Sequence, residues 1–110
     1  MISYILKTEE LDKFKIPYLE HNNTLYIQVL YADKLIEFCE HNYIFILGIE
    51  GFRFENQFIM PDMRYIADFS SLVFKKENFN LSYYHVKSFL QLIGQRDKDL
   101  SLEFVLERAQ

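Results

Sequence analysis

The stretch YIFILGIEGF, residues 43–52, decides the fold of this 110-residue chain. Its apolar run at residues 44–47 is rich in β-branched and aromatic side chains, which is typical of a strand buried on both faces. We therefore expect this strand to lie near the centre of a sheet. Gly48 and Gly51, two of the three glycines in the chain, are expected to give the backbone freedom to bend as the strand leaves the core.

A carboxylate, Glu50, lies between these two glycines. Strict alternation along the strand would turn it toward the apolar side, where an ionised and unpaired group costs several kcal/mol. Two alternatives avoid that cost. A bulge at either glycine can turn Glu50 toward water, or a basic group such as Arg53, Arg64 or a partner's side chain can meet it.

Hydrophobic periodicity defines the elements on both sides of this stretch. Apolar residues at helical spacing over residues 27–39 predict an amphipathic helix, most secure at 29–40, although residues 24–29 also suit a strand. After residue 51, aromatic and charged side chains alternate until the pattern breaks at residues 55–57. This break predicts a hairpin with its turn at that point.

The C-terminal third predicts one helix and one strand. Ser82 is typical of a helix N-cap and Gly94 of a helix stop, so a second helix is expected over residues 82–93. Apolar and polar residues alternate over residues 100–107, which predicts a strand with one face in water.

The remaining segments are less regular. Residues 2–6 suit a short strand, and the stretch at 7–24 is charged and turn-like. Residues 63–74 fit neither period, so only a strand or a short turn near 65–69 is expected. The whole order predicts an α+β fold, with one domain over residues 1–110 in which a mostly antiparallel sheet packs with two helices.

Composition and charge limit the classes of partner. Half of the residues are apolar and 17% are aromatic, which is enough to build one core. The net charge is −4, and residues 32–70 alone contain seven acids against three bases. An acidic surface argues against nucleic acid as a direct ligand and permits a basic protein partner.

Neither the N-terminus nor any apolar window resembles a secretory signal or a spanning helix, so we expect a cytoplasmic protein without membrane contact. The histidines His21, His41 and His85 lack metal-ligand spacing. The glycines do not form a phosphate-binding pattern. We therefore expect neither a metal nor a cofactor.

Two kinds of residue leave an enzymatic alternative open. Glu50, Asp62 and Asp68 are the acids set among apolar residues, and a pair of them could act as acid and base. Cys39, the single cysteine, lies on the apolar stripe of the first long helix. A buried structural thiol is the favoured interpretation there, because no helix start or cationic side chain is placed to lower its pKa.

Residues 31–70 contain ADKLIEFCEHNYIFILGIEGF (32–52) and PDMRYIADFS (61–70). This segment resembles the immunity proteins of bacterial toxin systems. In particular, the passage from an amphipathic helix into ILGIEG is similar to small cytosolic proteins that guard against contact-dependent growth-inhibition toxins and tRNA-cutting colicins. The resemblance implies an inhibitor rather than an enzyme, which binds the C-terminal nuclease domain of a cognate toxin, in particular an RNase, and keeps it from its substrate.

The acids of the middle segment and the side chains near them are therefore the candidates for partner contact. They are Glu50, Arg53, Phe54, Glu55, Asp62, Tyr65 and Asp68. Recognition is expected mainly on the hairpin and loop at residues 53–68. Two rival hypotheses remain: a small enzyme that uses paired carboxylates or Cys39, and a structural homodimer that exposes aromatic edges.

Overall fold

The computed structural model describes residues 2–73 and 79–108. In these ranges the strands are β1 (Ile2–Tyr4), β2 (Leu19–His21), β3 (Thr24–Gln28), β4 (Ile44–Glu55), β5 (Phe58–Asp68) and β6 (Ser101–Arg108). The helices are α1 (Thr8–Lys13), the 3₁₀ turn η1 (Val29–Tyr31), α2 (Ala32–His41), α3 (Ser70–Val73) and α4 (Phe79–Arg96). The chain has the predicted α+β architecture.

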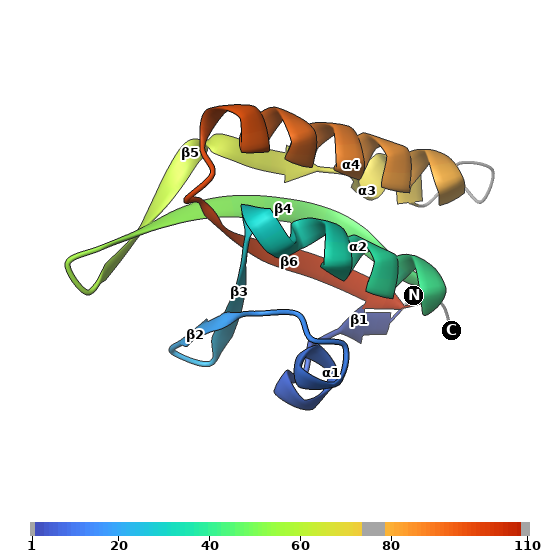
Figure 1. Cartoon of the computed structure of the whole chain (residues 1–110). Coiled ribbons are helices and arrows are strands. Elements are labelled where there is room, and N and C mark those ends of the chain that lie inside the picture. Colours follow the sequence, from blue (N-terminus) through green and yellow to red (C-terminus); the bar gives the residue numbers. More distant parts are fainter. Residues whose placement is uncertain (1, 74–78, 109–110) are drawn as a thin grey trace.

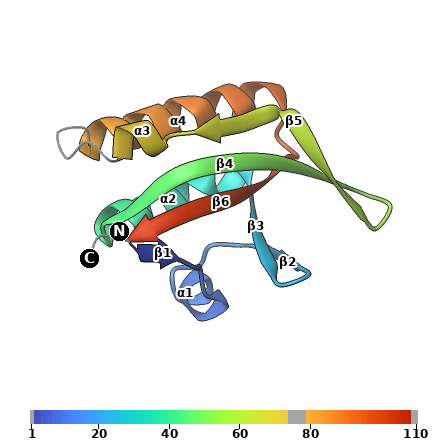
Figure 2. The same cartoon turned by 180° about the vertical axis from the view of Figure 1, so that it is seen from behind.

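The described strands form one antiparallel sheet in the order β2-β3-β6-β4-β5, and β1 also pairs with β6. The helices α2 and α4 lie along one face of this sheet (Figure 1). Seen from behind, β4 and β6 have no helix in front of them (Figure 2). The sheet therefore has one covered face and one open face, and β6 rather than β4 lies at its centre.

Burial along β4 follows from this one-sided cover. Ile44, Ile46 and Ile49 are fully buried against the helices, whereas Phe45 and Leu47 are half-buried on the other face. The expectation of a strand buried on both faces was therefore wrong. An apolar run this dense is typical of such strands, but here the second face has no helical layer over it.

Two register shifts interrupt β4. Against β6 the shift falls between Ile46 and Gly48, and against β5 it falls between Glu50 and Gly51. At the second shift, three residues of β5 (63–65) are inserted between the partners of Glu50 and Gly51. The side chain of Glu50 is exposed, so the predicted bulge that turns it toward water is confirmed.

The glycines provide space rather than unusual backbone angles. None of the three has a positive φ, so none is needed for a left-handed backbone, but both register shifts of β4 fall at Gly48 and Gly51, where the bend was expected. A Cβ on Gly51 would lie 2.7 Å from Cδ2 of Leu100 and 3.0 Å from Cβ of Tyr65. Gly51 therefore lets the hairpin approach the start of β6 closely.

The ambiguous segment before the first long helix divides cleanly. Residues 24–28 form β3, η1 follows, and α2 begins only at Ala32. The turn-like expectation for residues 7–24 missed α1 and β2, and the expectation for residues 63–74 missed α3. Residues 74–78, which include the end of that segment, lie outside the described ranges.

The predicted ends of the second helix were both wrong. α4 begins at Phe79, so Ser82 lies inside it and is buried instead of capping it. The helix also continues through Gly94 to Arg96. A Cβ on Gly94 would lie 3.7 Å from Cγ1 of Val29, an ordinary contact. No described helix has both the length and the apolar character needed to cross a membrane.

Candidate functional site

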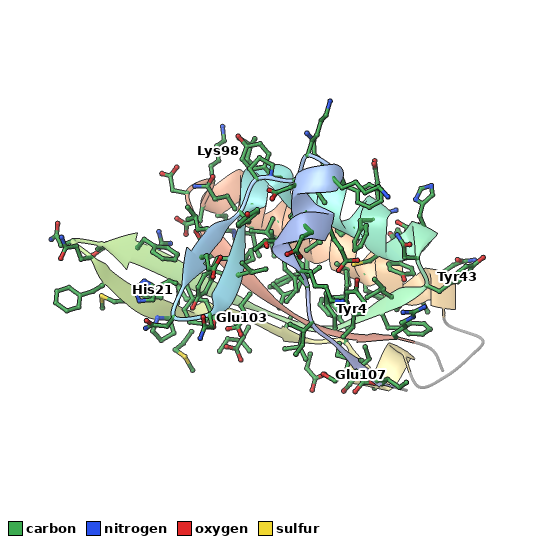
Figure 3. All side chains as sticks on the ribbon, turned by 90° about the horizontal axis from the view of Figure 1, so that it is seen from below. Tyr4, His21, Tyr43, Lys98, Glu103 and Glu107 are labelled. Carbon is green, nitrogen blue, oxygen red and sulfur yellow. The ribbon has the colours of Figure 1, made fainter. Side chains whose placement is uncertain are left out.

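The open face of the sheet carries alternating acidic and apolar side chains. Glu50 of β4 lies directly opposite Glu103 of β6 and Ile66 of β5. Val105 and Glu107 follow on β6 at alternate positions, and therefore on the same face as Glu103. Figure 3 shows Glu103 and Glu107 on the side of the sheet away from the helices. We call these five residues the open-face patch.

The carboxylates of this patch are not neutralised by neighbours. None of the ion pairs between the described residues includes Glu50, Glu103 or Glu107. The pKa of Glu103 is raised, mainly by partial burial and to a smaller extent by the negative charge of Glu50. Ile66 and Val105 expose about half of their surface between these acids. The patch can therefore offer negative charge and apolar area together to a partner.

A second group of charges lies on the covered side of the hairpin. Arg53 Nε lies 2.9 Å from Asp62 Oδ2, and Arg53 Nη2 lies 2.6 Å from Asp97 Oδ2. Arg64 donates to both carboxylate oxygens of Asp62, at 3.0 and 2.7 Å. Tyr65 donates its hydroxyl to Asp97 Oδ2 at 3.0 Å. These five residues form the ionic cluster, which ties the hairpin to the connection between α4 and β6.

Two members of the ionic cluster, Arg64 and Tyr65, are placed by an irregularity of the fold. The three-residue insertion in β5 positions Arg64 and Tyr65 beside Asp62, and the guanidinium of Arg64 lies 5.3 Å from the centre of the Tyr65 ring. Hydrogen bonds from Arg64 hold the pKa of Asp62 well below its usual range. Those from Arg53 and then Tyr65 lower the pKa of Asp97. The charges of the cluster pair with one another, so its main role is to stabilise the position of the hairpin.

The residues predicted for partner contact are therefore divided between four places, and Glu50 lies in the open-face patch. Arg53, Asp62 and Tyr65 come together in the ionic cluster. The structure adds two residues that sequence reasoning did not select as contacts, Arg64 and Asp97. Arg64 is close to Asp62 in the sequence, so a contact between the two could have been predicted. Asp97 is more than 30 residues from Tyr65 of the hairpin, and no sequence pattern connects the two.

Phe54 and Glu55 lie near the tip of the hairpin instead. The Phe54 ring packs edge-on against Tyr26, with ring centres 5.2 Å apart, and is 40% exposed. Asn56 and Gln57 both have positive φ, 47° and 72°, which is the pattern of a two-residue type I′ turn. The predicted turn at residues 55–57 is thus confirmed although it contains no glycine.

Asp68 lies apart from both groups, at the other end of β5. Its Oδ1 accepts a hydrogen bond from the backbone N–H of Ser70 at 2.9 Å. Bonds from Ser70 lower the pKa of Asp68. This arrangement stabilises the start of α3, which gives Asp68 a local structural role.

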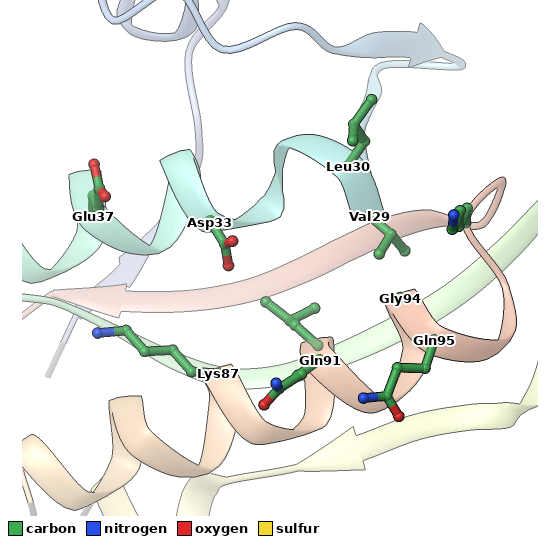
Figure 4. Close-up of a pocket in the computed structure, with 10 residues that line it drawn as sticks. Val29, Leu30, Asp33, Glu37, Lys87, Gln91, Gly94 and Gln95 are labelled. Carbon is green, nitrogen blue, oxygen red and sulfur yellow. The ribbon is translucent and has the colours of Figure 1, made fainter.

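A large cavity lies on the helical side of the molecule. It is a groove of about 700 Å³ between η1, α2 and α4, with Asp33 on one wall and Lys87, Gln91 and Gln95 on the other (Figure 4). Lys87 is already paired with Glu40, at 2.6 Å. None of the residues predicted for partner contact lines this groove.

The described residues contain no group of three or more side chains that could hold a metal ion. Cys39 is fully buried, and burial raises the pKa of its thiol to about 12, so the thiolate is scarce at neutral pH. Glu50 and Glu103 do form a carboxylate pair on the exposed sheet face, where Glu103 also lines a cavity of about 190 Å³ beside Tyr4 and Thr24.

The role of these surfaces has to be inferred from their geometry and charge. The candidates are the open-face patch and the hairpin tip, because the charges of the ionic cluster are already paired. No family model, no curated protein and no solved structure matches the chain.

Proposed function

We propose that this protein is a cytoplasmic immunity protein that binds a basic toxin nuclease domain, in particular an RNase, and covers its substrate cleft. The observation that carries the proposal is the open-face patch, where three unneutralised carboxylates alternate with exposed apolar side chains. The resemblance of residues 31–70 to immunity proteins supplies the class of partner. The patch supplies the chemistry by which such a partner would be recognised.

Charge favours a basic partner over nucleic acid and over a second copy. Nuclease clefts hold phosphates and are therefore basic, so an acidic face steers them together and speeds association. Nucleic acid would meet Glu50, Glu103 and Glu107 with like charge. A second copy docked through the same face would bring six carboxylates together, which disfavours self-association there.

Apolar area gives the complex its lifetime. Ile66 and Val105 are half-exposed on the sheet, and the partly buried Phe52 extends the apolar area toward the hairpin. Contacts of this kind lose their water on docking and slow dissociation, whereas the surrounding charges set the association rate. The sheet is rigid, so little conformational entropy is lost on binding.

The proposal is tested by mixing the protein with the toxin domain encoded immediately upstream of its reading frame. Calorimetry measures binding, and RNA cleavage together with growth rescue measures protection. Glu50→Lys reverses one charge of the patch and is expected to weaken binding at least about 10-fold, mostly through a slower association rate at low salt. Glu37→Lys, which reverses the charge of an exposed acid on α2 and so changes the net charge by the same amount, is the control and is expected to bind like the wild type.

Absence of a complex between the wild-type protein and that domain, or a complex that neither blocks RNA cleavage nor rescues growth, would sink the proposal. Equal loss of affinity in Glu50→Lys and Glu37→Lys would show that binding depends on overall charge. The open-face patch would then not be the docking surface.

A further inference from the structure

The distal half of the β4–β5 hairpin projects away from the body of the molecule. Residues 53–60, which we call the finger, extend beyond both helices in Figures 1 and 2. The finger contains the end of β4, the turn and the start of β5, paired in regular register from Gly51–Asp62 to Glu55–Phe58. It is therefore a two-stranded ribbon without a third strand beside it.

A two-stranded ribbon in water is marginally stable alone, and this one is braced at both ends. At the tip, the type I′ geometry of Asn56 and Gln57 matches the twist of the strands. At the base, Arg53 is held by Asp62 and Asp97. The finger is thus fixed in its direction before any partner arrives, which lowers the entropy cost of docking.

The finger nevertheless exposes large apolar side chains. Phe58 is 71% exposed, Met60 54% and Phe54 40%. The first two project from one side of the ribbon and Phe54 from the other. Phe54 already packs on Tyr26, so the side with Phe58 and Met60 is the free apolar side of the ribbon. A protruding ribbon with such a side is suited to entering a cleft.

Glu55 and Phe58 are directly opposite across the strands, so their side chains leave the same side of the ribbon with Cβ atoms about 5 Å apart. The charge of Arg53 on that side is already taken up by two aspartates. No ion pair between described residues includes Glu55. The tip therefore presents one free carboxylate beside one exposed aromatic ring.

Glu55 and Phe58 together resemble a nucleotide, because they present a negative group beside an aromatic ring. Sites for single-stranded nucleic acid combine basic groups for the phosphate with surfaces on which a base stacks. A carboxylate can bind the basic groups in place of the phosphate. A phenyl ring can stack on the surface in place of the base. We propose that the finger enters the substrate cleft of the nuclease and takes the place of a nucleotide, with Glu55 at a phosphate position and Phe58 at a base position. This inference rests on the function proposed above.

The experiment separates binding from competition with substrate. The upstream-encoded nuclease domain is titrated with the wild type, Phe58→Ser, Glu55→Gln and the double variant, and the inhibition constant for RNA cleavage is measured for each. The assay is repeated with increasing amounts of a non-cleavable 2′-deoxy analogue of the RNA. Ile5→Ser, which removes another highly exposed apolar side chain, is the matched control.

For the wild type, the apparent inhibition constant should rise in proportion to the concentration of the analogue. Phe58→Ser should raise the inhibition constant at least about 10-fold, and Glu55→Gln should raise it several-fold. Ile5→Ser should stay within twofold of the wild type. Circular dichroism verifies that each variant keeps the fold.

Failure of the finger and failure of the proposed function give different results. If the analogue competes with the wild type but both finger variants inhibit like Ile5→Ser, the finger is not in the cleft and the proposed function stands. If the wild type inhibits the nuclease but the analogue does not compete, the substrate cleft is not covered and both proposals fall. If the wild type neither binds nor inhibits, both proposals fall.

Discussion

Gly51→Ala tests how closely the hairpin approaches β6. The added Cβ would lie 2.7 Å from Cδ2 of Leu100 and 3.0 Å from Cβ of Tyr65. Leu100 is fully buried and cannot swing into water, and a Cβ atom such as that of Tyr65 moves only with its backbone. Overpacking of this kind costs about 1–3 kcal/mol. At roughly 4 °C per kcal/mol for a domain of this size, Tm should fall by about 4–12 °C.

Gly94→Ala is the matched control, because its Cβ would meet Val29 at an ordinary 3.7 Å. Alanine is favoured over glycine inside a helix, so this change should stabilise the protein by about 0.5–1 kcal/mol. Urea unfolding followed by circular dichroism measures both free energies, and unchanged m-values keep the comparison valid. The close-approach argument is wrong if Gly51→Ala unfolds within about 0.5 kcal/mol of the wild type, or if both changes shift stability in the same direction.

Three further predictions concern titratable groups. Cys39 should react with iodoacetamide at pH 8 at least about 100-fold more slowly in the native protein than in guanidinium, since its thiol is buried with a pKa of about 12. The pKa values of Asp62 and Asp97 are lowered in the folded protein, so both carboxylates stabilise the fold at a pH above about 3.9, the pKa of Asp in the unfolded chain, and this stability is lost as the pH falls below that value. In urea unfolding at pH 7 and pH 3, the free energy of unfolding of Asp97→Asn should therefore fall less on acidification than that of the wild type. Glu103→Gln should raise Tm at pH 7, because the raised pKa of Glu103 means that its ionisation opposes folding, and the same variant should bind the toxin domain more weakly in calorimetry.

Elements with a long, regular pattern were predictable from sequence. The strand around residues 44–47 follows from its continuous apolar run. The strand at 100–107 and the turn at 55–57 follow from alternation and its interruption. The helices α1 and α3 have six and four residues, fewer than two turns, so they leave no periodicity to detect.

The ends of α4 were not predictable for a different reason. Ser82 and Gly94 are residue types that end helices, but α4 continues past both: Ser82 is buried inside the helix, and Gly94 lies in its last turn. At both positions the tertiary contacts of α4 outweigh the preference of the residue type for a helix end.

The candidate site shows the same division between local and distant information. The cluster at Arg53, Asp62 and Tyr65 could be suspected because a hairpin brings neighbouring residues together. Asp97 could not, since its position depends on how α4 and β6 meet. Likewise Glu103 was seen only as an acid on the wet side of a strand, and nothing in the sequence indicated that Glu50 would face it.

The opposition of Glu50 and Glu103 is the strongest reason to look for a partner on the open face. The register shifts in β4 solve the problem of burying Glu50 by turning it outward, but they place it directly opposite another acid. Like charges directly opposite on a sheet lower stability, and no ion pair of the described residues offsets this one. A neutral side chain at either position would serve folding better. A cationic group of a partner would remove the repulsion on docking, so the strain in the free protein becomes a gain in affinity for a basic surface.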